Sequence, residues 1–182
     1  MKPEDLRGAC DALSADMVAW RRELHRHPEL GFEERRTAGF IEERLNKLGL
    51  EVRPGLARTG VAGLLRASNR RRPAVLLRAD MDGLPIQEAA GRDYGSEVAG
   101  TMHACGHDAH MAMLLGVATL LAPLADRLPR DVLFCFQPAE EGQGGAERMI
   151  REGVLDLTDV GSVFAIHVWS QFEAGTAHVR PG

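Results

Sequence analysis

The sequence predicts an α/β fold in which a mainly parallel sheet is flanked by helices. Two observations lead to this class. Short apolar runs of strand length alternate with stretches of helical periodicity, and acidic residues or histidines stand at or just beyond the ends of several of those runs. With 182 residues, 45% of them hydrophobic and 26% charged, the chain has the composition of a globular protein and can bury a substantial core.

The first part of the chain predicts two amphipathic helices. The stretch Asp11–His27 has apolar residues at helical spacing, and Pro28 disfavours a helical conformation at the residue before it. A second helix is expected over Thr37–Leu48, with Gly49 as a plausible C-terminal stop.

The later part predicts alternating strands and helices. Ala109–Leu121 is apolar on nearly all sides, which is typical of a helix in the protein interior, and Gly145–Arg151 predicts a short helix. Four apolar runs bounded by turn residues predict strands, at Val61–Leu65, Ala74–Leu77, Val132–Phe136 and Val163–Val168.

Composition argues against several classes of partner. The formal net charge is -4, and the short run Arg70–Arg72 is expected to be a solvated turn, so nucleic acid is not an expected partner. Residues Met1–Ala9 lack the apolar core of a signal peptide, and no apolar run approaches the ~20 residues that span a bilayer, so no membrane partner is expected. Without either signal, a reducing, cytoplasmic location is the default expectation, and the three cysteines show no spacing typical of a disulfide framework.

The densest group of chemically active residues is Met102–His110. It contains one thiol and three imidazoles, and Gly106 permits a tight loop between Cys105 and His107. Thiolate and imidazole together suit zinc and related divalent ions. Taken alone, Cys105 could equally be a small buried residue.

Other candidate residues follow the predicted strands, where ligands bind in α/β sheets. Of the adjacent pair Glu140 and Glu141, one could bind metal while the other accepts a proton, although such pairs are also common on solvated surfaces. His167 could be a ligand or a satisfied core histidine. Asp80 could orient a metal-bound histidine, and the alternative for Asp80 and Asp82 is turn chemistry.

Taken together, these motifs resemble the M20 metallopeptidase family. The similarity is to its amidohydrolase branch, which includes hippurate hydrolases, N-acyl-amino-acid deacylases and indole-acetyl-amino-acid hydrolases. The matching segments occur in family order, at Leu24–Gly31, Arg78–Pro85, Met102–His110, Gln137–Gly142 and Ile166–His167.

The resemblance implies a zinc-exopeptidase-like catalytic domain that cleaves the amide bond of N-acyl amino acids. Two divalent ions (Zn, Mn, Co or Ni) would activate a water. The implied roles are a bridging thiolate from Cys105, terminal ligands from His107 and His167, a carboxylate ligand from Glu141, a general base in Glu140 and a supporting residue in Asp80.

The remaining histidines have weaker assignments. His103 and His110 could support the ligands from behind. His25 and His27 belong to a motif of the family, but they are expected to cap and pack the first helix.

The resemblance also implies that residues 1–182 are the N-terminal portion of an incomplete catalytic domain. A lid or dimerisation domain, which would make a homo-oligomer of the full-length form, and a C-terminal catalytic segment with a further histidine ligand would lie outside this sequence. The boundary would fall near Val179–Gly182, and the sheet would keep an open edge with apolar surface.

Three alternatives to an active amidohydrolase stay open at this stage. The chain could be a truncated, catalytically inactive metal-binding fragment. Cys105 could act as a nucleophile with a histidine base. The cluster could also be a structural zinc module, although such sites are usually closed and rich in cysteine.

Overall fold

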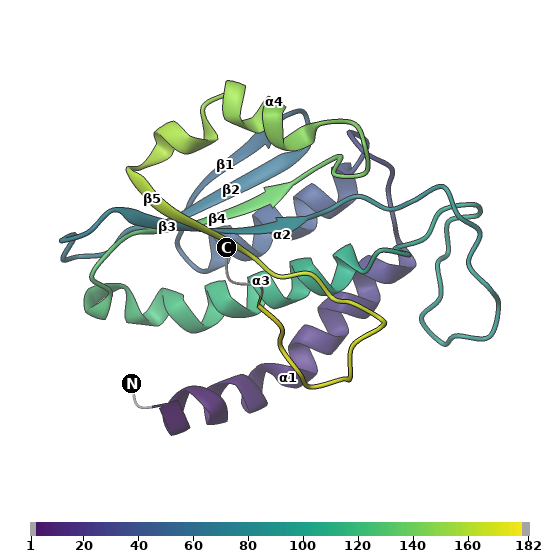
Figure 1. Cartoon of the computed structure of the whole chain (residues 1–182), viewed down its shortest axis with the longest axis horizontal. Coiled ribbons are helices and arrows are strands. Elements are labelled where there is room, and N and C mark those ends of the chain that lie inside the picture. Colours follow the sequence, from purple (N-terminus) through teal and green to yellow (C-terminus); the bar gives the residue numbers. More distant parts are fainter. Residues whose placement is uncertain (1–2, 180–182) are drawn as a thin grey trace.

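A five-stranded sheet forms the centre of the computed structural model, which describes residues 3–179 (Figure 1). The strands lie in the order β1-β2-β4-β3-β5. Their bounds are Glu51–Leu56 (β1), Gly60–Leu65 (β2), Ala74–Asp80 (β3), Val132–Gln137 (β4) and Val160–Ala165 (β5). The expected boundary near Val179–Gly182 falls almost entirely outside the described residues.

The sheet is mixed. β3 is parallel to both β4 and β5, whereas β2 is antiparallel to β4 and to β1. The predicted α/β class is confirmed, but the sheet is mixed rather than mainly parallel, and its parallel part consists of β3, β4 and β5. β1 and β2 are antiparallel because a short turn joins them directly, and a parallel pair needs a long crossover.

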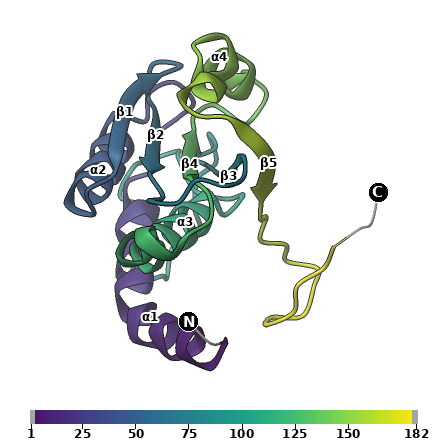
Figure 2. The ribbon, with the colours of Figure 1, turned by 90° about the vertical axis from the view of Figure 1, so that its left-hand side faces the viewer.

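Helices cover both faces of the sheet (Figures 1 and 2). On one face lie α1 (Pro3–Arg26), α2 (Arg35–Lys47) and α3 (His107–Leu121), the last continued by the 3-10 helix η1 (Ala122–Arg127). On the other face lie α4 (Gly145–Arg151) and the 3-10 helix η2 (Val154–Leu157).

The sequence of β4 reflects its position between these two layers. Val132, Phe134 and Phe136 belong to the core under α1, α2 and α3, while Leu133 and Cys135 belong to the core under α4. Side chains alternate between the faces of a strand, so a strand that is covered on both sides reads as an unbroken apolar run.

Several element boundaries differ from expectation. α1 begins at Pro3 rather than near Asp11, and β5 ends at Ala165 rather than Val168, so His167 lies beyond the strand. β1 had no predicted counterpart, because Pro54 and Gly55 are poor strand formers; Pro54 is tolerated here because β1 is an edge strand.

The predicted stop of the second helix at Gly49 is confirmed. Gly49 has a φ of 76°, and the amide of Leu50 donates to the carbonyl of Leu45 at 3.2 Å. A left-handed glycine with this hydrogen bond is the usual helix-ending motif.

The stretch His107–Arg127, which joins α3 and η1, has the length and mean hydropathy of a membrane-spanning helix. The expectation that no apolar run approaches this length was therefore wrong for this stretch. Core helices meet the same criteria, and α3 packs between α1 and β3, which accounts for its apolar composition.

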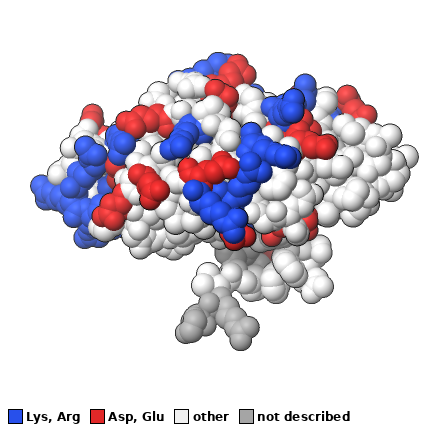
Figure 3. Space-filling view, turned by 90° about the horizontal axis from the view of Figure 1, so that it is seen from above, with Lys and Arg blue, Asp and Glu red and all other residues white. Residues whose placement is uncertain are grey.

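The surface has two features that bear on partners. Basic and acidic side chains are interspersed over the face seen from above (Figure 3).

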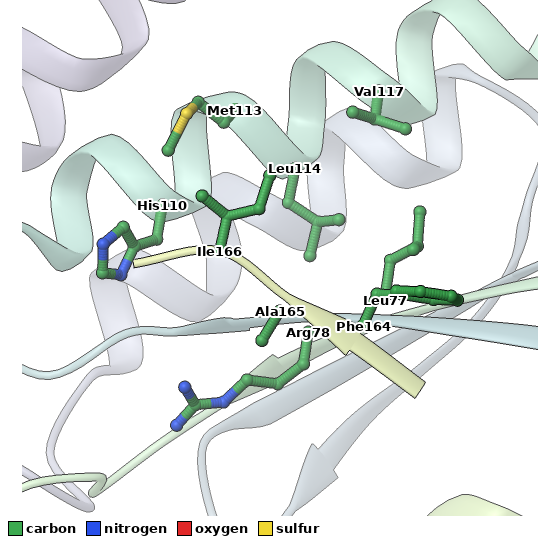
Figure 4. Close-up of a pocket in the computed structure, with 9 residues that line it drawn as sticks. All are labelled: Leu77, Arg78, His110, Met113, Leu114, Val117, Phe164, Ala165 and Ile166. Atoms are coloured by element: carbon green, nitrogen blue, oxygen red, sulfur yellow. The ribbon is translucent and has the colours of Figure 1, made fainter. Parts of the chain in front are cut away.

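β5 lies at the edge of the sheet with Val163 and Phe164 exposed, and a cavity of about 110 Å³ opens between β5 and α3 (Figure 4). The expected open edge with apolar surface is therefore present in the described part of the chain.

Candidate metal centre

The residues proposed from the sequence gather at one end of the sheet. Asp80 is the last residue of β3, and the pair Glu140 and Glu141 follows β4. His107 is the first residue of α3, with Cys105 in the loop before it. The carboxyl ends of β3 and β4 meet at the same edge because the two strands are parallel, which brings these segments together.

His107 lies at the centre of this group and is fully buried. Its Nδ1–H donates to the backbone carbonyl of Asp82 at 2.9 Å, and the carboxylate Oδ1 of Asp82 lies 3.2 Å from the same nitrogen. Within residues 3–179 its Nε2 has no hydrogen-bond partner, although Asp80 Oδ2 lies 3.6 Å away and Glu141 Oε1 lies 3.8 Å away. The Nε2 atom therefore faces a space lined by carboxylates.

Cys105 and His167 complete one side of the group. Cys105 Sγ lies 3.4 Å from His167 Nε2, and His167 Nδ1 donates to the carbonyl of Val168 at 2.6 Å. Ligand atoms of Cys105, His107 and His167 all lie within 4.8 Å of one another. His107 and His167 thus share an arrangement in which Nδ1 is held by a carbonyl and Nε2 is left for the cluster.

The Cys105 thiol is held in its protonated form in the metal-free chain. Burial, a hydrogen bond with Glu141 and the nearby negative charges of Asp80 and Glu140 raise its pKa to about 12. Reactive cysteine nucleophiles need a lowered pKa. The surroundings therefore disfavour a free thiolate nucleophile and favour a partner that brings positive charge.

Glu140 and Glu141 are carried by a loop that is fixed through its backbone. The amide of Glu141 donates to Asp82 Oδ2 at 3.0 Å. A carboxylate oxygen from each glutamate lies within 4.8 Å of a ring nitrogen of His107. The Glu140 side chain is exposed and that of Glu141 is 31% exposed, so both can reach a ligand from the solvent side.

Two residues near the centre had no firm assignment from the sequence, and the first of them is Asp82. It contacts the Nδ1 side of His107, opposite the nitrogen that faces the cluster. Asp80 instead lies on the Nε2 side. The spacing of two residues at the end of a strand could have suggested Asp82, because it directs both side chains to the same side.

The second residue is His110. Its Nδ1–H donates to Asp80 Oδ1 at 2.6 Å, and its Nε2 accepts the amide proton of Val168 at 2.9 Å. Both ring nitrogens are thus occupied within the protein. His110 connects the end of β3 to the segment that carries His167, which matches the supporting position considered for it.

The other histidines of the motifs, His25, His27 and His103, are not among the candidate metal-ligand groups of the described chain. His25 is buried and bridges two carboxylates, with Nδ1 2.9 Å from Asp108 Oδ2 and Nε2 3.0 Å from Glu88 Oε1. His27 lies at the end of α1, with Nδ1 2.9 Å from the carbonyl of Glu23. His103 is buried, and neither of its ring nitrogens has a hydrogen-bond partner in the described chain.

The donor set fits a divalent metal ion. Two imidazole nitrogens, a thiol and carboxylates from separate segments converge on one space, and among the described residues the buried Nε2 of His107 has no hydrogen-bond partner. Histidine ligands usually donate their other ring N–H to a carbonyl or carboxylate, as His107 and His167 do. The mixture of sulfur, nitrogen and oxygen donors admits several transition metals.

Comparison with known proteins agrees with this geometry. Residues 76–182 match the family model described as Peptidase family M20/M25/M40, which covers more than half of the chain. The chain belongs to this family. The resemblance seen in the motifs is thereby confirmed.

Relatives within the M20 family include hydrolases of acylated amino acids. The chain is 46% identical over 178 residues to an N-acyl-L-amino acid amidohydrolase of Geobacillus stearothermophilus, and the match covers 96% of the chain and 47% of the relative. It is 42% identical over 170 residues to an N-acetyl-L-cysteine deacetylase of Bacillus subtilis, covering 93% of the chain and 40% of the relative. The chain thus spans less than half the length of either relative.

A solved structure supports the fold assignment. A dinuclear metal binding peptidase of the M20 family from Bacillus subtilis superposes with a TM-score of 0.88 at 38% identity, covering 94% of this chain and 48% of that one. The fold of the described residues is therefore that of an M20 peptidase domain.

Proposed function

We propose that this chain is the metal-binding part of an amidohydrolase that cleaves N-acyl amino acids. The observation that carries the proposal is the buried Nε2 of His107, which has no hydrogen-bond partner in the part of the chain that the structure describes and faces the same space as Cys105, Glu141 and His167. The relatives named for N-acyl-L-amino acids and N-acetyl-L-cysteine support the substrate class.

In this proposal Cys105, His107, Glu141 and His167 would hold two divalent ions, of which zinc, manganese, cobalt and nickel are candidates. When bound, such ions supply Lewis acidity, which lowers the pKa of water and stabilises negative charge on an amide oxygen. Asp82 would hold His107 in the tautomer with a free Nε2 lone pair, because it contacts the protonated Nδ1.

Glu140 would be the general base. Its carboxylate is exposed and lies beside Glu141 near His107, so it can reach a water at the cluster. Glu140 would accept a proton as that water attacks the amide carbonyl carbon. It would then deliver this proton to the nitrogen as the C–N bond breaks, which releases the acid and the amino acid.

The test separates metal binding from turnover. Purified chain is titrated with Zn²⁺, Mn²⁺, Co²⁺ and Ni²⁺ and is then assayed with N-acetyl and N-benzoyl amino acids, with and without a chelator. We expect metal-dependent hydrolysis that Glu140→Gln abolishes while metal affinity is retained. We expect Cys105→Ser to lower metal affinity.

Each other outcome has a defined meaning. Metal binding without hydrolysis of any N-acyl amino acid would favour the alternative, a catalytically inactive metal-binding fragment. Hydrolysis unchanged by the chelator would overturn the metal mechanism. Failure of the wild-type chain to bind any of the four ions would overturn the proposed centre.

A further inference from the structure

Glu34 is a fully buried acidic residue that has no role in the proposed chemistry. It lies at the N-terminal end of α2. Buried carboxyl groups are rare unless they are paired or hydrogen-bonded. Its partners therefore indicate why it is there.

Both carboxyl oxygens of Glu34 have partners from distant segments. Oε1 accepts the backbone N–H of Ala139 at 2.9 Å, and Oε2 accepts the hydroxyl of Thr59 at 2.5 Å. Ala139 immediately precedes Glu140 and Glu141. Glu34 thus forms a hydrogen bond with a residue 105 positions later in the sequence, in the backbone of the loop that carries Glu140 and Glu141.

The capping of α2 shows that this orientation is not a local helix effect. Glu34 occupies the N-cap position, yet its side chain makes no capping hydrogen bond. Glu29 caps the helix instead, with its carboxylate accepting the amides of Arg36 at 3.1 Å and Thr37 at 2.8 Å. Because Glu29 satisfies the helix end, the Glu34 side chain is available to turn into the interior.

The backbone that Glu34 contacts, at Ala139, has an unfavourable conformation. Ala139 has a φ of 51°, a left-handed conformation that is uncommon for a residue with a side chain. Such conformations persist only where the surroundings hold them. Here Glu34 holds the Ala139 N–H, the amide of Gly145 donates to the Ala139 carbonyl at 3.1 Å, and Asp82 holds the Glu141 N–H.

We propose that Glu34 is a positioning residue that sets the direction of Glu140 and Glu141 by fixing Ala139 in its left-handed conformation. The inference rests on the proposed function for its consequence at the metal centre. The part of the inference that concerns the backbone of residues 139–141 does not depend on that function.

The test uses hydrogen exchange and Zn²⁺ titration on the purified chain. In Glu34→Ala we expect the amide of Ala139 to exchange at least about tenfold faster relative to the amide of Phe134 in β4, which reports global opening. We expect Zn²⁺ affinity to fall about tenfold, the lower end of the effect of removing a supporting group. Glu34→Gln keeps an oxygen acceptor for the Ala139 N–H and should restore most of both properties.

Glu29→Ala is the matched control, because the Glu29 carboxylate likewise accepts backbone N–H groups, those of Arg36 and Thr37, but holds only α2. It should lower the thermal midpoint and leave both Ala139 exchange and Zn²⁺ affinity unchanged. If Glu34→Ala does not fold, Glu34→Leu fills the same volume without an acceptor and takes its place.

Wild-type exchange at Ala139 in a folded Glu34 variant would overturn the proposal, as would Glu29→Ala reproducing both effects. Faster exchange at Ala139 with unchanged Zn²⁺ affinity would overturn the link to the metal centre. If the wild-type chain binds no Zn²⁺, the proposed function fails, but the exchange measurement still decides the role of Glu34.

Discussion

Asp80 and Asp82 differ in what they contact, although they are only two residues apart. Asp80 Oδ1 accepts from His110, and its Oδ2 pairs with Arg78 at 2.8 Å. Asp82 lies against Nδ1 of His107 and also holds the amide of Glu141. The support for His107 that the sequence suggested for Asp80 is thus better matched by the position of Asp82.

This difference predicts that removing the charge of Asp82 weakens metal binding. We expect Asp82→Asn to weaken Zn²⁺ binding about 10- to 100-fold, because it disturbs both the His107 tautomer and the Glu141 backbone. Calorimetric titration measures the affinity. Asp131→Asn is the control, since Asp131 is an equally buried carboxylate that holds the amide of Ala67 far from the centre. Equal losses in both variants would contradict the prediction.

Asp80 also predicts how stability depends on pH. Burial alone would raise its pKa, but the hydrogen bond with His110 and the charges of His107 and Arg78 outweigh burial and lower the pKa from 3.8 to about 2. A lowered pKa in the folded state gives stability that is present above the ordinary value and is lost as the pH falls toward 2.

Between pH 6 and pH 3 we therefore expect the wild-type chain to lose about 1 kcal/mol of unfolding free energy through Asp80. Urea denaturation at both pH values, in metal-free buffer, measures the loss. Asp80→Asn cannot titrate at this position and should lose correspondingly less. The same decrease in the variant would show that Asp80 does not contribute.

At the scale of elements, the connection from β4 to α4 fixes the loop with Glu140 and Glu141. α4 begins at Gly145, and a Cβ atom built there would lie 1.8 Å from the carbonyl oxygen of Pro138. Only glycine allows the helix to start so close to the end of the strand. The sequence motif Glu140-Glu141-Gly142 is thus supported by a glycine outside the motif.

We expect Gly145→Ala to destabilise the chain by about 1–3 kcal/mol, because backbone must move to admit the methyl group. Gly39→Ala is the control. Gly39 is exposed within α2 with no atom near its Cβ position, so alanine should stabilise the helix by about 0.5–1 kcal/mol. Thermal or urea denaturation measures both changes, and a neutral Gly145→Ala would contradict the close approach.

At the scale of the whole molecule, the most prominent surface feature is the edge strand β5, which exposes apolar side chains. β5 pairs with β3 on one side only, and Val163 and Phe164 are each about 60% exposed. Leu77, Leu114 and Phe164 line the cavity between β5 and α3 (Figure 4). An apolar edge strand of this kind offers unpaired backbone groups to another chain.

We therefore expect the purified chain to self-associate as its concentration rises, and Val163→Lys to reduce this association several-fold, because a charge on an edge strand opposes pairing. Sedimentation velocity at increasing concentration measures it. Val18→Lys makes the same chemical change on an exposed position of α1 and should have little effect. Association that is insensitive to Val163→Lys would place the contact elsewhere.

The sequence by itself determined most of the elements and the family. Patterns within a few residues predicted α2 with its stop at Gly49, the interior helix α3 and the strand β4, because these patterns depend on local spacing. The same short-range patterns carried the motifs by which the M20 family was recognised. They failed for β1 and for the end of β5, where pairing with a neighbour decides and local composition does not.

Only the tertiary structure decided which atoms face one another. Asp82 rather than Asp80 lies at Nδ1 of His107, which leaves the Nε2 of His107 to face the cluster. Glu34 holds the backbone of Ala139. These arrangements depend on contacts between residues that are 25 to 105 positions apart in the sequence. Such contacts arise from the packing of the helices and loops around the parallel strands. No local pattern encodes them, because each partner alone is an ordinary acidic residue, histidine or backbone amide.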